Sequence, residues 1–137
     1  MIHDVPAALV PDLWSAVEGY LAQALKPHPF LTTEGLLQIL LAGRAQLVLV
    51  VDKQIVGAVV MEVVDYPGAS VGNVLALGGE RGFNKRYLAS VVDHLERWCR
   101  EKRCDSMMLL GRPGWSRYAV ARGGETLPLL MAWKKLR

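Results

Sequence analysis

The sequence has 137 residues, of which 52% are hydrophobic and 21% charged, and its formal net charge is +3. This length is typical of a single domain that buries its apolar surface without disulfides or metals, and the composition excludes a disordered chain. The small positive charge permits an anionic ligand such as a nucleotide phosphate, but it does not indicate nucleic-acid binding.

Two helices are predicted at the start of the chain. Residues 11–25 carry an apolar stripe at helical spacing, and a proline suits the first turn. Pro27 and Pro29 end this helix because neither can continue the hydrogen-bond ladder. Thr32 is the expected N-cap of a second amphipathic helix, which Gly43 closes.

Three strands follow these helices. Residues 45–51 and 55–64 are rich in β-branched side chains and flank a short polar turn at 52–54, which predicts a hairpin. A second turn at 66–69 leads to a third strand at 71–77, which two glycines end. Because polar residues interrupt the apolar run of the hairpin, we expect strands there and not a membrane span.

The second half of the chain alternates helices and strands. Residues 84–102 form the clearest amphipathic helix of the sequence, with oppositely charged i,i+4 pairs on its polar side. A strand at 105–110, a short helix at 115–122 and a last strand at 126–133 complete the prediction.

The predicted order is therefore ααβββαβαβ, an α/β (α+β) fold. Several strands are apolar at both odd and even positions, which face opposite sides of a sheet, so we expect helices on both faces. The strand–helix–strand unit from 71 to 110 predicts one parallel pair inside a mixed, mostly antiparallel sheet.

Neither secretion nor a metal site is indicated. An acid and two prolines stand in residues 1–11, where a signal peptide needs an apolar run. Cys99 and Cys104 are too few and too close for a disulfide framework, and their spacing fits neither a CxxC redox pair nor zinc ligands. We therefore expect a cytoplasmic protein with reduced, packed thiols, no membrane segment and no metal.

At this length, the order of elements resembles the GNAT (N-acetyltransferase-like) superfamily over nearly the whole chain. The strand 71–77, the glycine loop 78–83, the long helix behind it and the glycines at 123–124 carry the resemblance. The family's first strand is missing or reduced to residues 2–5, and one strand follows the last helix where the family has two. The resemblance implies a single GNAT-like domain spanning residues 1–137.

A further likeness concerns the turn at 111–115 and the helix end Trp98-Cys99, which resemble small GNAT-like proteins of tailed bacteriophages. It implies the cytoplasm of a bacterial host as the location. It also leaves open an alternative to catalysis, in which a GNAT-fold phage protein binds partners or has a structural role.

The loop before the long helix suits an anion. A helix N-terminus presents unpaired N–H groups, and glycines let the backbone approach a phosphate closely. Arg81, Lys85 and Arg86 add positive charge there. The sequence therefore permits a phosphate-bearing ligand at this loop, with an ordinary structural turn as the alternative.

The resemblance implies acetyl-CoA as the cofactor, because GNAT enzymes hold its pyrophosphate through a Q/R-x-x-G-x-G/A motif in this loop. With the first glycine of that motif at Gly82, its first position falls on Gly79 and its last on Asn84, so the match is incomplete. The residues that the resemblance assigns to the cofactor are Leu75, Leu77, Gly79, Arg81, Gly82, Phe83, Asn84 and Lys85.

Acetyl transfer to an amine needs a base for the ammonium group and an acid for the leaving thiolate. GNAT enzymes often take the base from a glutamate on a central strand, and Glu62 is the only ionisable residue in the apolar run 55–64. A solvated glutamate on an exposed sheet face is the alternative. The family's acid is a tyrosine on the last helix; Tyr118 lies one residue before the expected position, Ala119, so a packing aromatic is the alternative there.

The family also places part of its acceptor site in the loop between the first two helices, where His28 and Phe30 stand. The resulting hypothesis is an acetyl-CoA-dependent N-acetyltransferase that acts on an amine of a small molecule or a protein. A homodimer through the last strand is a further expectation, because it would cover an exposed sheet edge.

Overall fold

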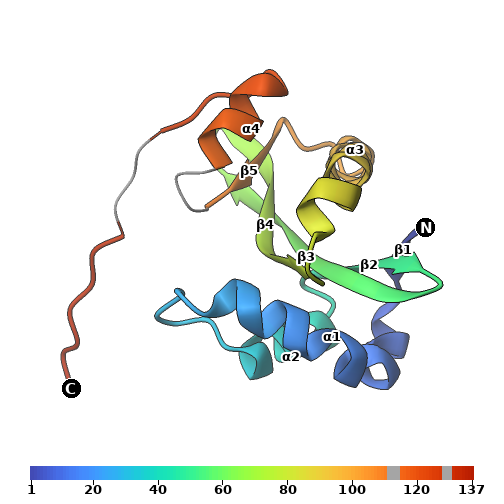
Figure 1. The fold of residues 1–137 in the computed structure, drawn as a ribbon. Coiled ribbons are helices and arrows are strands. Elements are labelled where there is room, and N and C mark those ends of the chain that lie inside the picture. The colour runs from blue at the N-terminus through green and yellow to red at the C-terminus, as the bar shows by residue number, and fades with distance from the viewer. Residues whose placement is uncertain (111–114, 128–130) are drawn as a thin grey trace.

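The computed structural model describes residues 1–110, 115–127 and 131–137. One sheet separates two N-terminal helices from the helices of the second half (Figure 1). In chain order the elements are β1 (Ile2–Val5), the 3-10 helix η1 (Ala7–Leu9), α1 (Val10–Leu25), α2 (Thr33–Leu41), β2 (Gln46–Asp52), β3 (Gln54–Tyr66), β4 (Ala69–Gly79), α3 (Phe83–Glu101), β5 (Ser106–Leu109) and α4 (Trp115–Ala121). Of the helices described, none has both the length and the apolar character that a membrane crossing requires.

The strands form a sheet in the order β1-β2-β3-β4-β5. Neighbours from β1 to β4 are antiparallel, whereas β4 and β5 are parallel because α3 carries the chain back between them. Helices α1 and α2 cover one face of the sheet and α3 covers the other (Figure 1). The predicted fold class, a mixed and mostly antiparallel sheet with helices on both faces, is confirmed.

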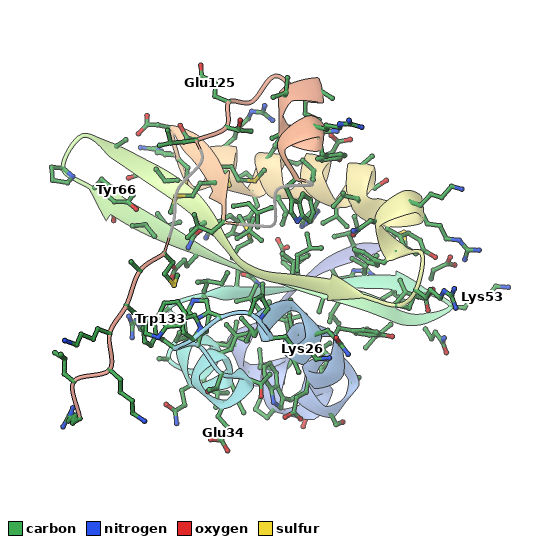
Figure 2. The ribbon with its side chains drawn as sticks, turned by 60° about the vertical axis from the view of Figure 1, so that its left-hand side comes forward. Lys26, Glu34, Lys53, Tyr66, Glu125 and Trp133 are labelled. Atoms are coloured by element: carbon green, nitrogen blue, oxygen red, sulfur yellow. The ribbon has the colours of Figure 1, made fainter. Side chains whose placement is uncertain are left out.

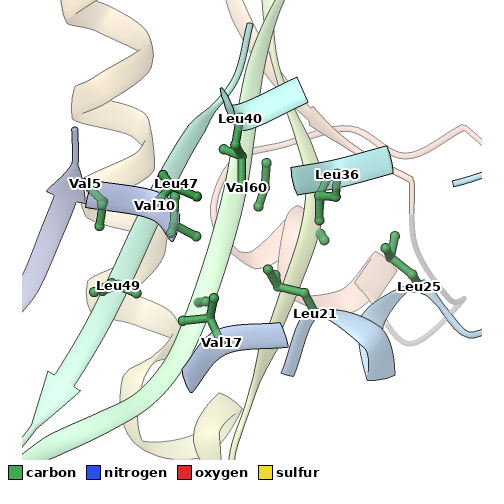
Figure 3. Close-up of a cluster of buried hydrophobic side chains, with 12 residues drawn as sticks. Val5, Val10, Val17, Leu21, Leu25, Leu36, Leu40, Leu47, Leu49 and Val60 are labelled. Atoms are coloured by element: carbon green, nitrogen blue, oxygen red, sulfur yellow. The ribbon is translucent and has the colours of Figure 1, made fainter. Parts of the chain in front are cut away.

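Two clusters of buried apolar side chains, one on each face of the sheet, join these layers. Leu47 and Val60 pack under α1 and α2 (Figure 3), whereas Val48 and Val59 of the same strands pack under α3. The α1/α2 cluster consists of Val5, Val10, Val17, Leu21, Leu25, Leu36, Leu40, Leu47, Leu49, Ala58, Val60 and Ala76. The α3 cluster consists of Val48, Val50, Val56, Val59, Met61, Val74, Phe83, Val91, Leu95, Trp98 and Cys99.

Helix α2 begins and ends next to the capping residues that the sequence predicts. Thr32 is its N-cap, and the Thr32 Oγ1 accepts a hydrogen bond from the N–H of Gly35 at 3.1 Å. After the helix, Gly43 has φ +71°, a left-handed conformation that glycine adopts without strain. Both capping predictions are confirmed.

The order of elements differs from the prediction at both ends of the chain. Residues Ile2–Val5 form β1, which pairs along β2, so a strand precedes the helices. The strand predicted at 126–133 is wrong for its described part, because residues 126–127 and 131–133 are not in a strand. That segment contains Pro128, which has no N–H to donate to a ladder. Positions 128–130 and the predicted turn at 111–114 lie outside the described residues.

Candidate active site

The parallel pairing of β4 and β5 ends partway along β4, at a place that we call the fork. They pair along four residues of each strand, from Val71↔Ser106 to Val74↔Leu109. β5 then ends, whereas β4 continues to Gly79 with no strand on its β5 side in the part of the chain described. Backbone groups of residues 75–79 that face away from β3 therefore have no strand partner, and a ligand could bond to them.

A β-bulge in β4 lies at the base of the fork. The register between β3 and β4 slips there, which leaves Leu75 without a partner in β3. The slip reverses the alternation of side chains, so that Val74 belongs to the α3 cluster and Ala76 to the α1/α2 cluster. Bulges bend a strand and increase its twist, and this one lies where the pairing of β4 with β5 ends.

Leu75 and Leu77, both assigned to the cofactor from the sequence, lie on the free part of β4. Leu75 packs against the α1/α2 cluster and Leu77 against the α3 cluster, each with a partly buried side chain. Their side chains thus pack against the core, and their backbone groups could bond to a ligand at the fork.

The N-terminus of α3 follows the fork directly and has an unbalanced positive charge. Gly82 is its N-cap with φ +82°, no side chain caps the helix and its first turn holds no acid. The N–H groups of Asn84 and Lys85 belong to the first turn of the helix, where N–H groups have no carbonyl acceptor within the helix. Arg81, Lys85 and Arg86 are exposed around them, so this end of the helix attracts anions.

Gly79 and Phe83 have packing roles that the sequence did not reveal. The Phe83 side chain is only 3% exposed, and a Cβ added at Gly57 or Gly79 would lie 2.3 Å from its ring. The two glycines therefore make room for this ring. The ring of Phe83 is in the core, and the Phe83 N–H donates to the carbonyl of Glu80 at 3.0 Å, so the assignment of Phe83 to the cofactor stays a prediction.

Glu62 lies on β3, level with the pair of β4 and β5 residues that precedes their last pair. It stands opposite Asn73 of β4, which in turn pairs with Met108 of β5. The Asn73 Nδ2 donates a hydrogen bond to the Glu62 Oε1 at 3.1 Å, and both side chains are partly buried. The structure thus holds the carboxylate in a fixed position on the sheet. Asn73, its partner, gave no signal in the sequence.

Tyr118 lies on α4, where its hydroxyl is buried and has no hydrogen-bond partner among the described residues. Its ring packs edge-on against Trp115, with centroids 6.1 Å apart, and the guanidinium of Arg122 lies 5.9 Å from the ring centroid. Arg122 also pairs with Asp93 and Glu96 of α3, which fixes α4 against that helix. The ring thus packs against its neighbours, and a role for the buried hydroxyl as an acid stays a prediction.

His28 and Phe30 occupy the loop between α1 and α2. The His28 Nδ1 accepts hydrogen bonds from the N–H groups of Phe30 and Leu31, at 3.1 and 2.9 Å, so this nitrogen shapes the loop. Phe30 is 65% exposed and meets the ring of Trp133 edge-on at 6.1 Å. Figure 2 shows the C-terminal segment passing beside the N-terminal helices, with Trp133 next to them.

A separate hollow of about 490 Å³ lies between β1 and α3, away from the fork. Ile2, Tyr87, His94 and Arg97 border it. The hydroxyl of Tyr87 donates to Asp52 at 2.6 Å, and this hydrogen bond to a carboxylate raises the pKa of Tyr87. Within the described ranges, no group of three or more His, Cys, Asp or Glu side chains could hold a metal ion.

No family model matches the sequence, and no curated protein is similar to it in sequence. Solved acetyltransferase structures, in contrast, are similar along the whole chain. An aminoglycoside acetyltransferase from an uncultured soil metagenomic sample has a TM-score of 0.73 at 11% identity, covering 100% of this chain and 96% of that one. Glucosamine-6-phosphate N-acetyltransferase from Arabidopsis thaliana has a TM-score of 0.69 at 13% identity, covering 100% and 98%.

A third similar structure, the aminoglycoside enzyme AAC(6')-Iy, was solved with a bisubstrate analogue that contains CoA. It has a TM-score of 0.70 at 17% identity, covering 98% of this chain and 97% of that one. Identities this low establish the fold alone. Together with the sheet order and the parallel β4–β5 pair, these full-length matches show that the chain has the fold of the GNAT acetyltransferases.

Proposed function

We propose that the protein is an acetyl-CoA-dependent N-acetyltransferase. The observation that carries this proposal is the fork, in which the edge of β4 that no described strand covers leads directly to the basic N-terminus of α3, where no side chain caps the helix. Acetyl-CoA has an extended arm with amide groups, and a pyrophosphate stands at one end of that arm. The strand edge offers hydrogen bonds to the amides, and the helix end offers positive potential to the pyrophosphate.

The residues present fit this cofactor with two departures from the family's motif, Gly79 at its first position and Asn84 at its last. Because a Cβ at Gly79 would collide with Phe83, no long side chain can stand there to reach a phosphate. Arg81, Lys85 and Arg86, with the first N–H groups of α3, supply the positive charge in its place. Bound acetyl-CoA supplies an acetyl group activated as a thioester.

Glu62 is our candidate for the base and Tyr118 for the acid. The Glu62 carboxylate, held by Asn73, would take a proton from the acceptor ammonium, directly or through a water molecule. The unpartnered Tyr118 hydroxyl would donate a proton to the departing thiolate. The acceptor is an amine of a small molecule or a protein, and the exposed His28–Phe30 loop would form part of its site.

The sequence predicts a homodimer through a last strand at 126–133; because no strand forms in the described part of that segment, a dimer would use the outer edge of the sheet at β5 instead. β5 is the last strand of the sheet in the described residues, and Leu109 and Leu110 beside that edge are exposed. An uncovered edge with apolar neighbours favours pairing with a second copy. Light scattering after size-exclusion chromatography should give the dimer mass, whereas a monomer at micromolar concentration would reject this part of the proposal.

Acetyl-CoA binding measured by calorimetry tests the proposed function. We expect saturable binding by the wild type and at least a tenfold weaker affinity for the double variant Lys85→Glu, Arg86→Glu, because two repelling charges replace two attracting ones at the helix end. Arg44→Glu, a charge reversal at an exposed position after α2, is the matched control and should bind as the wild type does. No binding at millimolar acetyl-CoA would favour the non-catalytic GNAT-fold alternative.

A further inference from the structure

The two cysteines of the chain meet where α3 ends. The N–H of Arg103 donates to the carbonyl of Arg100 at 3.0 Å, and the N–H of Cys104 donates to the carbonyl of Cys99 at 2.9 Å. Arg103 itself is left-handed, with φ 60°. These features define a Schellman motif, which brings the residue that starts the last helical turn next to the residue that follows the left-handed one. In this chain those two residues are Cys99 and Cys104.

Both thiols lie in the same apolar setting but differ in access. Cys99 is 5% exposed within the α3 cluster, whereas Cys104 is partly exposed and packs against that cluster from outside. Burial first, and then the neighbouring Cys104 thiol, raise the pKa of Cys99 to about 11. The two sulfur atoms are therefore close enough to influence each other, and Cys104 is the one that reagents reach first.

We propose that Cys99 and Cys104 form a reversible disulfide across the end of α3 when the protein meets a small-molecule disulfide such as oxidised glutathione. A disulfide needs Cα atoms within about 7 Å of each other. The main-chain hydrogen bond between the two cysteines holds their backbones together in the reduced state already. The spacing in sequence does not indicate this pairing; the left-handed residue between the cysteines creates it.

The reaction consists of two exchanges. The Cys104 thiolate attacks one sulfur of oxidised glutathione, which forms a Cys104–glutathione bond and releases one glutathione thiolate. The Cys99 thiol then loses its proton and attacks the Cys104 sulfur, which forms the Cys99–Cys104 bond and releases the second glutathione thiolate. The protein loses two protons and two electrons, and one glutathione disulfide is reduced to two thiols.

The raised pKa of Cys99 makes the second exchange the slow one near neutral pH. Only the thiolate attacks, and burial, the largest cause of the raised pKa of Cys99, persists in the adduct, so the thiolate is a small fraction near pH 7. Because that population grows about tenfold for each pH unit below the pKa, the closing step should accelerate about tenfold per unit from pH 7 to 9. The glutathione adduct at Cys104 should accumulate at the lower pH.

Formation of this disulfide would also change a contact between α3 and the sheet. A Cβ added at Gly72 would lie 2.2 Å from the Cys99 Sγ, so this sulfur already rests on the β4 backbone. Gly72 pairs with Met107 of β5, in the short stretch of parallel pairing below the fork. Rotation of the Cys99 side chain toward Cys104 changes that contact, which makes the amide of Gly72 a local reporter of the reaction.

Intact-mass spectrometry with peptide mapping tests the inference on the full chain. Reduced wild type treated with oxidised glutathione should first gain one glutathione, then lose it and end with an internal Cys99–Cys104 bond and no free thiol, as the amide signal of Gly72 moves. Cys99→Ala should stop at the adduct on Cys104. Cys104→Ser, whose side chain is partly exposed, should keep its fold and react at least tenfold more slowly than the wild type.

Two results would overturn it. One is a wild type that ends as a stable Cys104 adduct or as a covalent dimer at pH 9. The other is Cys104→Ser reacting as fast as the wild type, which would show that Cys99 is attacked without its neighbour. The outcome does not depend on acetyl-CoA binding, so the failure of either proposal leaves the other untouched.

Discussion

Gly79 shows that one glycine can be needed for packing as well as for a proposed ligand contact. Its place in a glycine loop before a helix suggested a phosphate contact, but the ring of Phe83 occupies the space that its missing side chain leaves. A sequence shows that a residue is glycine, not which side chain lies opposite it. Glu62 is the converse case: its isolation in an apolar strand identified it, whereas the register of β3 and β4 was needed to find Asn73.

Gly79→Ala should destabilise the protein, because its Cβ would lie 2.3 Å from the Phe83 ring and both backbones are fixed. We expect a loss of about 1–3 kcal/mol in the free energy of unfolding, typical of overpacking. Gly19→Ala is the control, since nothing lies within 4 Å of a Cβ at this exposed helical position; it should stabilise by about 0.5–1 kcal/mol. Urea denaturation of both variants measures the difference, and equal effects would contradict this packing.

Glu62→Gln keeps an oxygen that can accept the hydrogen bond from Asn73 but removes the basic carboxylate. If Glu62 is the base, kcat should fall about 100-fold or more while acetyl-CoA affinity stays unchanged. Release of free thiol from acetyl-CoA, followed with a panel of primary amines, gives the rate. A variant as active as the wild type would remove Glu62 from the mechanism.

The elements that could be predicted are those with a strong period or a clear end signal. The amphipathic pattern of α3 and the caps of α2 identified them within a residue or two. The bulge at Leu75 could not be predicted, because a strand that is apolar at both parities shows no change of alternation when its register slips. β1 was suggested only by the family resemblance, which left open whether residues 2–5 form a strand, since these four residues become one only by pairing with β2.

Thr32→Ala tests the capping argument at the level of one helix. Loss of the hydrogen bond from Gly35 should lower the free energy of unfolding by about 1 kcal/mol. Thr33→Ala lies one residue later, inside the helix, and should change stability by a few tenths at most. A Thr32 variant as stable as the Thr33 variant would show that the cap contributes nothing.

At the scale of the whole molecule, strands apolar on both faces predicted a sheet between two helical layers, and both clusters confirm it. The strand expected at 126–133 is absent from its described part, because apolar residues do not by themselves supply a neighbouring strand. The single domain and the phage relationship stay predictions.

The two clusters should contribute comparably to stability. Leu21→Ala in the α1/α2 cluster and Leu95→Ala in the α3 cluster each remove a side chain that is at most 1% exposed. Each should cost about 2–5 kcal/mol. Leu41→Ala, at a side chain 49% exposed, should cost far less. Thermal or urea unfolding of the three variants measures these losses. If either buried leucine lost as little free energy of unfolding as Leu41, the result would contradict a two-layer core.

The central claim is that acetyl-CoA lies in the fork with its pyrophosphate at the start of α3. Amide chemical shifts recorded by NMR during an acetyl-CoA titration test it most directly. We expect the largest shifts at residues 75–79 and 84–86, with little change around Ile2 and His94 at the hollow between β1 and α3. Saturating acetyl-CoA that leaves residues 75–86 unshifted, or that shifts the hollow instead, would contradict it.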